Sequence, residues 1–249
     1  MEEKAEKLGV NGFVGRSQPI TEMKPRIDGS GWKVIVKCHQ LVDKSVSLGL
    51  AWGFEKPHAL RVSTLALRLF DQLQPLHGMG NTERIWLRTA ALLHDIAKPR
   101  HPRCHHKVAR DVILKATELP FRRGDRVMIA LAARYHRGSL PNKAHAYYRD
   151  LDAESRRYVA KLAALLRLAD GLDKGRTGVV EELRCQIDGD RVRLTAFSRG
   201  FPSIDKALRK SDLFTKVFGN RVLIDVETIH PCLGFNLDPA DEMAYARSA

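Results

Sequence analysis

Three absences narrow the class of protein before any motif is considered. The 249 residues contain four cysteines, at positions 38, 104, 185 and 232, and no two of them form a Cys-x-x-Cys pair. This argues against a disulfide framework and a structural zinc knuckle, and it favours a reducing compartment. No apolar run approaches the roughly 18–20 residues of a membrane span. The N-terminal Met-Glu-Glu-Lys also lacks the pattern of a signal peptide. We therefore expect a cytoplasmic protein with no membrane partner.

Acidic residues are scarce relative to basic ones. The chain has 29 Asp and Glu against 42 Lys and Arg, which gives a formal net charge of +13. An excess of this size attracts polyanions such as nucleic acid, nucleotides or polyphosphate. A solvated basic surface with no specific partner would give the same total. Because no nucleic-acid-binding signature is recognisable, we favour a small anionic phosphorylated substrate over nucleic acid.

Hydrophobic periodicity divides the chain into three parts. Residues 1–30 mix charge with Gly, Pro and Ser, and we expect a flexible lead there. Residues 31–177 show helical periodicity around 58–73, and further helices are predicted near 84–97, 107–117, 124–135 and 152–170. Residues 178–249 form the third part, a small subdomain with a tail.

In this third part the period changes to two. The run Asp188-Gly189-Asp190 separates two alternating segments, as in a hairpin. A helical stretch over 203–218 and a third strand over 222–226 follow. The predicted fold class is α+β, a mainly α-helical bundle with a small C-terminal β-β-α-β unit. Its strand edge would be exposed, which leaves a homodimer open.

Polar side chains occur where this pattern predicts buried helix faces. His94 and Asp95 close the apolar run that begins at Ala90, and His58 and Asp170 lie on the inward stripes of their own helices. Taken singly, each could be a hydrogen-bonded core residue. Together they are better explained by a divalent metal, since burying an unpaired imidazole or carboxylate is costly. His136 is a further candidate ligand. Such ligands suit Mn, Fe, Co, Zn or Mg and leave positions open for water and substrate.

The order of these residues resembles a known family. His58, His94-Asp95 and Asp170 match the H…HD…D pattern of the HD-domain metal-dependent phosphohydrolases. Residues 45–228 more closely resemble the C-terminal region of the exopolyphosphatase / guanosine pentaphosphate phosphohydrolase (Ppx/GppA) family. The phrases that carry this likeness are His58–Val62, Leu69–Leu73, Leu92–Ile96, His105–Lys107, Ala133–Pro141, Leu165–Asp173 and Leu213–Gly219.

The resemblance implies an HD-type helical bundle followed by a small α/β appendage. Full-length family members carry their polyphosphatase site in actin-like domains upstream, for which this chain has no room. An enzymatic activity would therefore have to come from the HD site itself.

Similarity to dinuclear HD proteins implies that His105 and His136 complete a second metal position. His106 is an equally good neighbour for this role, and both could instead be surface histidines. Asp95 would then bridge the metals, with a metal-bound hydroxide as nucleophile. We expect one or two ions, with Mn favoured.

Basic residues flank the predicted ligands. Lys98 follows the His-Asp pair by about one helical turn, where it could act on a substrate phosphate, or simply favour a helix C-terminus. Arg61, Lys107 and Arg137 are further candidates for phosphate contact, because Arg in particular matches phosphate geometry.

The leading hypothesis is a metal-dependent phosphohydrolase that cleaves a phosphate ester or anhydride of a nucleotide-like or polyphosphate substrate. Asp95 and Lys98 are its expected catalytic residues. The alternative is a non-catalytic module that binds nucleic acid or a phosphorylated effector.

Overall fold

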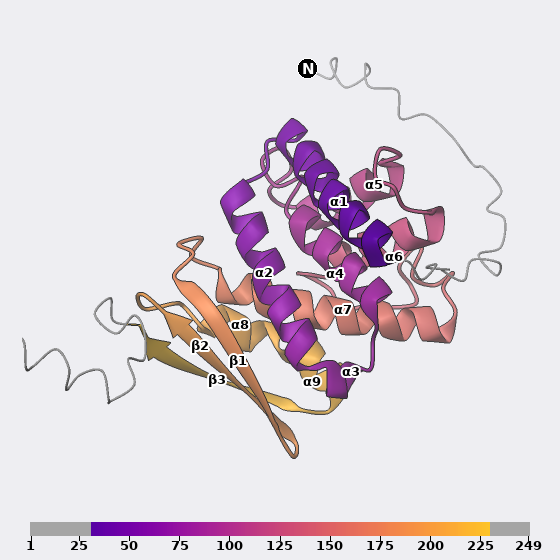
Figure 1. The fold of residues 1–249 in the computed structure, drawn as a ribbon. Helices are drawn as coiled ribbons and strands as arrows, with labels where there is room; N and C mark the ends of the chain where they lie inside the picture. Colours follow the sequence, from indigo (N-terminus) through magenta and orange to yellow (C-terminus); the bar gives the residue numbers. More distant parts are fainter. Residues whose placement is uncertain (1–30, 230–249) are drawn as a thin grey trace, which may run out of the picture.

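A computed structural model describes residues 31–229, with the side chains of 31–39 left aside. The predicted lead over 1–30 and the tail over 230–249 lie outside the described residues. The helices are α1 (Gly31–Ala51), α2 (Lys56–Gln72), α3 (Gln74–His77), α4 (Asn81–Leu93), α5 (His105–Lys115), α6 (Arg123–Arg134), α7 (Ala153–Leu172), α8 (Asp205–Lys210) and α9 (Asp212–Phe218). The strands are β1 (Val180–Asp188), β2 (Arg191–Ser198) and β3 (Arg221–Thr228). Figure 1 shows the strands together beside the helices. This confirms the predicted α+β class.

Local signals set the ends of these helices. A proline in the first turn starts α2, and Asp152 caps α7 by accepting a hydrogen bond from the Ser155 amide at 2.7 Å. The prediction that one helix runs to residue 97 is wrong, because α4 ends at Leu93 and three-residue turns follow. Successive residues of a continuous α-helix point about 100° apart. The tighter turn lets both His94 and Asp95 face the interior.

The C-terminal unit has the predicted β-β-α-β order. Strands β1 and β2 are antiparallel and joined at Gly189, whose φ of 53° is the left-handed conformation expected of a hairpin glycine. Strand β3 pairs parallel to β2, and the crossover between them is two short helices, α8 and α9, instead of one. Buried apolar side chains of the strands and of the helices form one continuous core. The predicted boundary at residue 178 stays a prediction.

The free edge of β1 is partly covered by α2. The Gln72 side chain donates to the Leu183 carbonyl and accepts from the Cys185 amide, both at 2.8 Å. A single side-chain amide therefore takes the place that a neighbouring strand would fill. The homodimer considered from this edge stays a prediction.

Helix α8 packs closely on the end of α7. A Cβ atom added to Gly171 would lie 2.5 Å from Ala207 Cα, and Ala207 is fully buried. This contact holds the basic residues of α8 beside Asp170. The sequence therefore needs glycine here for close approach of two backbones, not for a special turn.

We expect Gly171→Ala to reduce the free energy of unfolding by about 1–3 kcal/mol, because the extra methyl group must push α8 away. Urea denaturation of the full chain measures this. Gly175→Ala is the matched control, since its Cβ would meet only the Thr177 side chain, at 3.6 Å. Equal stability of the two variants would show that α8 does not depend on this contact.

Candidate metal centre

The six predicted metal ligands come together from five parts of the fold. They are His58 near the start of α2, His94 and Asp95 just after α4, His105 at the start of α5, His136 just after α6, and Asp170 near the end of α7. All four histidines are at most 3% exposed. Their ligand atoms form three overlapping groups, in each of which the atoms lie within 4.8 Å of one another. The structure thus brings together residues that are up to 112 positions apart in the sequence.

Each histidine ring is oriented through its Nδ1 atom. In His94, His105 and His136 this atom lies 2.7, 2.9 and 2.7 Å from the carbonyl oxygen three residues earlier. A carbonyl only accepts, so Nδ1 carries the proton and Nε2 keeps its lone pair. The Nδ1 atom of His58 is bound instead by Asp173, at 2.7 Å. Buried partners of this kind are typical of metal-ligating histidines.

The Nε2 atoms point at the two carboxylates. Asp95 Oδ1 lies 3.0 Å from His105 Nε2 and 3.5 Å from His136 Nε2. Asp170 Oδ1 lies 3.4 Å from His58 Nε2 and 3.6 Å from His94 Nε2. Lone pairs on nitrogen and oxygen therefore face each other across short distances inside the protein.

The donor set fits a divalent cation. The Nε2 atoms of His58 and His94 are buried and have no hydrogen-bond partner among the described residues. An unpaired buried acceptor is unfavourable, and a metal ion between imidazole and carboxylate groups would satisfy it. Burial would raise the pKa of Asp95, but electrostatic contacts with His94, His105 and His136 hold it far below its usual range. Asp95 is thus kept in the ionised form that a metal ligand requires.

Three cations neutralise the same carboxylates. Arg176 and Lys98 donate to Asp95 Oδ2 at 2.5 and 3.0 Å, and Lys210 of α8 forms an ion pair with Asp170. Burial would raise the pKa of Asp170, but the Lys210 charge, followed by the neighbouring His58 and His94 imidazoles, lowers it well below its usual range. The cluster is therefore bordered by positive charge on both sides.

Every residue of the cluster except His94 lines a cavity of about 280 Å³. Its cationic lining consists of Lys98, Arg137, Arg167, Lys174, Arg176, Lys206, Arg209 and Lys210, and no apolar side chain lines it. Lys98 and Arg137 are thus placed where the sequence analysis expected them. A polar cavity with this charge suits a phosphate group.

Two of the expected phosphate-binding residues do not line this cavity. Arg61 donates to the Val180 carbonyl at 3.2 Å, so it connects α2 to β1 instead. Lys107 lies two positions after His105 on α5, and it lines a neighbouring cavity. Neither side chain lines the cavity at the metal cluster, and their contact with a substrate phosphate stays a prediction.

Sequence reasoning missed several residues of the site. Asp173 belongs to the same sequence phrase as Asp170, and its spacing of three residues was a usable signal. Arg176 and Lys210 gave no local signal, because the first lies in a turn and the second on a short helix of the C-terminal unit. Only the packing of α8 on α7 brings Lys210 to the site.

Residues 45–217 match the family model described as Ppx/GppA phosphatase, domain III. No curated protein matches the chain. In the part of the chain that the structure describes, no helix is long and apolar enough to cross a membrane.

The metal-free protein is expected to lose stability as the pH rises through the titration of His58. Burial lowers the pKa of His58, but the nearby Asp170 and Asp173 carboxylates outweigh it and raise this pKa to about 9. Because the folded-state pKa lies above the unfolded value of 6.5, the stabilisation is full below pH 6.5 and is lost toward pH 9. The loss is on the order of 2–3 kcal/mol.

This prediction is checked with denaturant unfolding of wild type and His58→Gln in excess chelator. Charges common to both proteins cancel in the difference between their unfolding free energies. That difference should shrink between pH 6 and pH 9 by the amount given above. A difference independent of pH would show that His58 is not held in its charged form by the two carboxylates.

Proposed function

The chain belongs to the Ppx/GppA phosphatase family, and from this premise we propose that it is a metal-dependent phosphohydrolase of the HD superfamily. It would hydrolyse a phosphate ester or anhydride of a small nucleotide-like or polyphosphate substrate. One observation carries the proposal: the buried Nε2 atoms of His58 and His94 have no partner among the described residues and face the Asp95 and Asp170 carboxylates.

We propose that one or two divalent ions, with Mn favoured, are held by the six residues of the cluster. His58, His94 and Asp170 would serve one position and His105 and His136 the other, with Asp95 between them. When bound, the metal supplies a Lewis acid that polarises a phosphoryl oxygen and lowers the pKa of water.

The protein's own cations would bind and orient the phosphate groups. Lys174, Lys206 and Arg209 line the cavity and form no ion pair within the described part of the chain, so their donors are available to a ligand. Lys98 and Arg176 are already bonded to Asp95. They would hold that carboxylate in place and face the developing negative charge at the same time.

The alternative of a binding module without turnover uses the same cavity. The arrangement favours an enzyme because the cations and most of the His and Asp groups of the cluster line a single cavity. A substrate phosphate bound by these cations would therefore lie against the ligands. Binding alone does not require four histidines with inward-facing lone pairs.

Metal content and activity should be lost together in site variants. We expect wild type to retain one or two equivalents of metal and to release phosphate from a panel of nucleotides and polyphosphates. His94→Ala and Asp95→Asn should lose both, with activity reduced by at least about a hundredfold. Asp71→Asn is the control, because Asp71 pairs with Arg84 on the surface.

Elemental analysis of the purified proteins measures the metal, and a phosphate-release assay measures the activity. Wild-type protein that neither retains nor takes up Mn²⁺ would contradict the proposed function. So would full activity in the metal-free Asp95→Asn variant.

Arg209 is expected to act on substrate affinity. It is exposed on α8 and has no hydrogen bond or ion pair among the described residues that its removal would break. With a substrate identified in the panel, Arg209→Ala should raise KM about tenfold with little change in kcat, since a lost charged hydrogen bond is worth about 1.5–3 kcal/mol. Lys216→Ala on α9 is the control. An unchanged KM would mean that α8 does not contact the substrate.

A further inference from the structure

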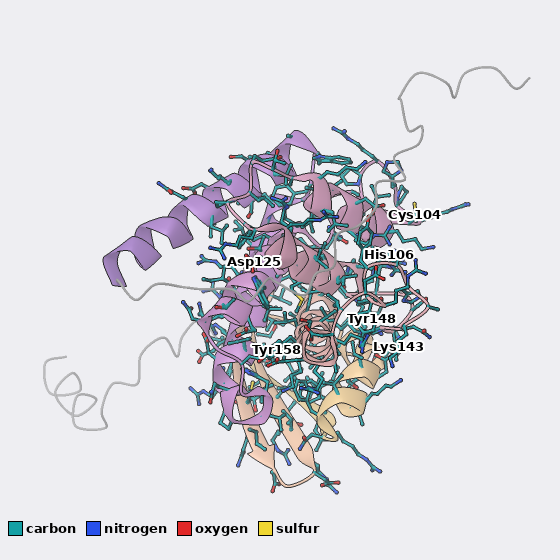
Figure 2. The ribbon with its side chains drawn as sticks, turned by 90° about the vertical axis from the view of Figure 1, so that its right-hand side faces the viewer. Cys104, His106, Asp125, Lys143, Tyr148 and Tyr158 are labelled. Atoms are coloured by element: carbon teal, nitrogen blue, oxygen red, sulfur yellow. The ribbon has the colours of Figure 1, made fainter. Side chains whose placement is uncertain are left out.

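A second cavity lies next to the metal cluster and is not used by the proposed reaction. Its volume is about 500 Å³, and it lies between the start of α5, the end of α6 and residues 138–146. Figure 2 shows Cys104 and His106 on the same side of the molecule as Lys143 and Tyr148. Gly138 lines both cavities. The two spaces are therefore neighbours with separate linings.

The lining of this second cavity is basic. Arg103, Lys107, Arg110 and Arg134 contribute to it, and no acidic side chain does. Arg103 and Lys107 are exposed. The basic residues that flank the predicted ligands in the sequence are thus divided between two cavities and are not confined to the metal site.

Arg134 is the decisive residue. It is only 5% exposed, and its Nη1 atom is buried with no hydrogen-bond partner among the described residues. The acid whose charge acts on it is Asp111, but the Asp111 carboxylate is bound by Arg110 at 2.7 and 2.8 Å. The ring of Tyr135 lies 5.4 Å from the guanidinium carbon and supplies no negative charge. A buried guanidinium without an anion is unfavourable, so the cavity lacks its counter-charge.

Nearby groups complete the polar lining. The Nδ1 atom of His106 is also buried without a partner in the described part of the chain. His145 is bonded to the Tyr135 hydroxyl at 2.9 Å, and the Ser139 side chain lines the wall. Two unpartnered nitrogen atoms, together with Arg103 and Lys107, which form no ion pair with the described residues, point to an oxyanion with several acceptor oxygens.

We propose that this second cavity is a separate binding site for a phosphate group, with Arg134 as its buried anchor and Lys107 at its mouth. The ligand is either inorganic phosphate or the phosphate of a small monoester, because both present the same dianionic group. Occupation of the site does not require the metal. Since the rings of His105 and His106 lie 5.7 Å apart, a bound phosphate sits one residue away from the metal cluster.

Site-resolved NMR of the full chain in excess chelator tests this proposal. Inorganic phosphate and ribose 5-phosphate are titrated separately, at constant ionic strength, against ¹⁵N-labelled protein. The amides of Ser139, Ala144 and Ala146 report on this cavity, since these residues line it and not the first one. At least one of the two ligands should shift the resonances of these amides. The ligand with the lower Kd shows whether the site prefers inorganic phosphate or a phosphate monoester.

Three variants make the result specific. Arg134→Met should weaken binding about tenfold or more, as expected for one charged hydrogen-bonding group. Because it also removes an uncompensated buried charge, this variant should melt no lower than wild type without ligand. Lys107→Met changes an exposed residue, so it tests the same cavity without risk to folding, and it should weaken binding less. Arg123→Met, an exposed arginine on the same helix, should bind as wild type does.

The proposal is overturned if neither probe shifts these amides, or if Arg134→Met and Lys107→Met bind as tightly as Arg123→Met. It is also overturned if only amides of residues 170–176 and 206–210 respond, since these line the first cavity. The outcome is independent of hydrolysis. Phosphate binding without enzymatic activity would refute the proposed function alone, and activity without this binding would refute the second site alone.

Discussion

The geometry of the site depends on one constraint: four buried imidazole rings are each fixed through Nδ1, so that four Nε2 atoms face two carboxylates. Three rings bind a backbone carbonyl three residues earlier, and His58 binds Asp173. These bonds leave only lone pairs on the inner side of the cluster. A proton or a metal cation between the nitrogen and oxygen atoms would remove the repulsion of their lone pairs. The described residues offer no hydrogen-bond donor to the Nε2 atoms of His58 and His94. Much of the fold serves to hold this arrangement.

The C-terminal unit contributes to the site through α8. The close contact of Gly171 with Ala207 sets α8 against α7, and Lys210 then reaches Asp170. A second contact connects α7 to α9: the buried Arg167 guanidinium donates to both carboxylate oxygens of Asp212, at 2.8 and 3.1 Å. The crossover between β2 and β3 therefore supplies one wall of the cavity. A helical bundle without this unit would keep the candidate metal ligands and lose Lys206, Arg209 and Lys210, the cations that α8 provides.

The sequence predicted what regular periodicity and residue chemistry determine. The fold class follows from the change of period near residue 178, and the ligands His58 and Asp170 follow from their places on inward helix faces. His136 was a candidate ligand from the sequence, but its pairing with His105 was implied by the family resemblance, because both lie at helix ends, where periodicity gives no direction. Arg61 shows the limit of spacing arguments. One turn after His58 it was expected at the substrate, but it binds a strand that no helical pattern could place.

The positions of side chains that reach the site only through tertiary packing could not be predicted from the sequence. Lys210 and Arg176 arrive at the site from a short helix and a turn, and the unpaired state of Arg134 is visible only when its surroundings are known. Net charge predicted a basic surface but not its division into two cavities. Long-range contacts of this kind depend on the close packing of helices and strands. Single residues such as Gly171 permit this packing, but no sequence pattern marks them as doing so.

The central claim is that the buried His and Asp groups form a metal centre. Anomalous diffraction at the Mn absorption edge, from crystals of the full chain grown with Mn²⁺, tests it most directly. The account predicts one or two strong peaks among His58, His94, Asp95 and Asp170, or extending to His105 and His136. A structure with these side chains in the same positions and no anomalous peak among them would contradict it.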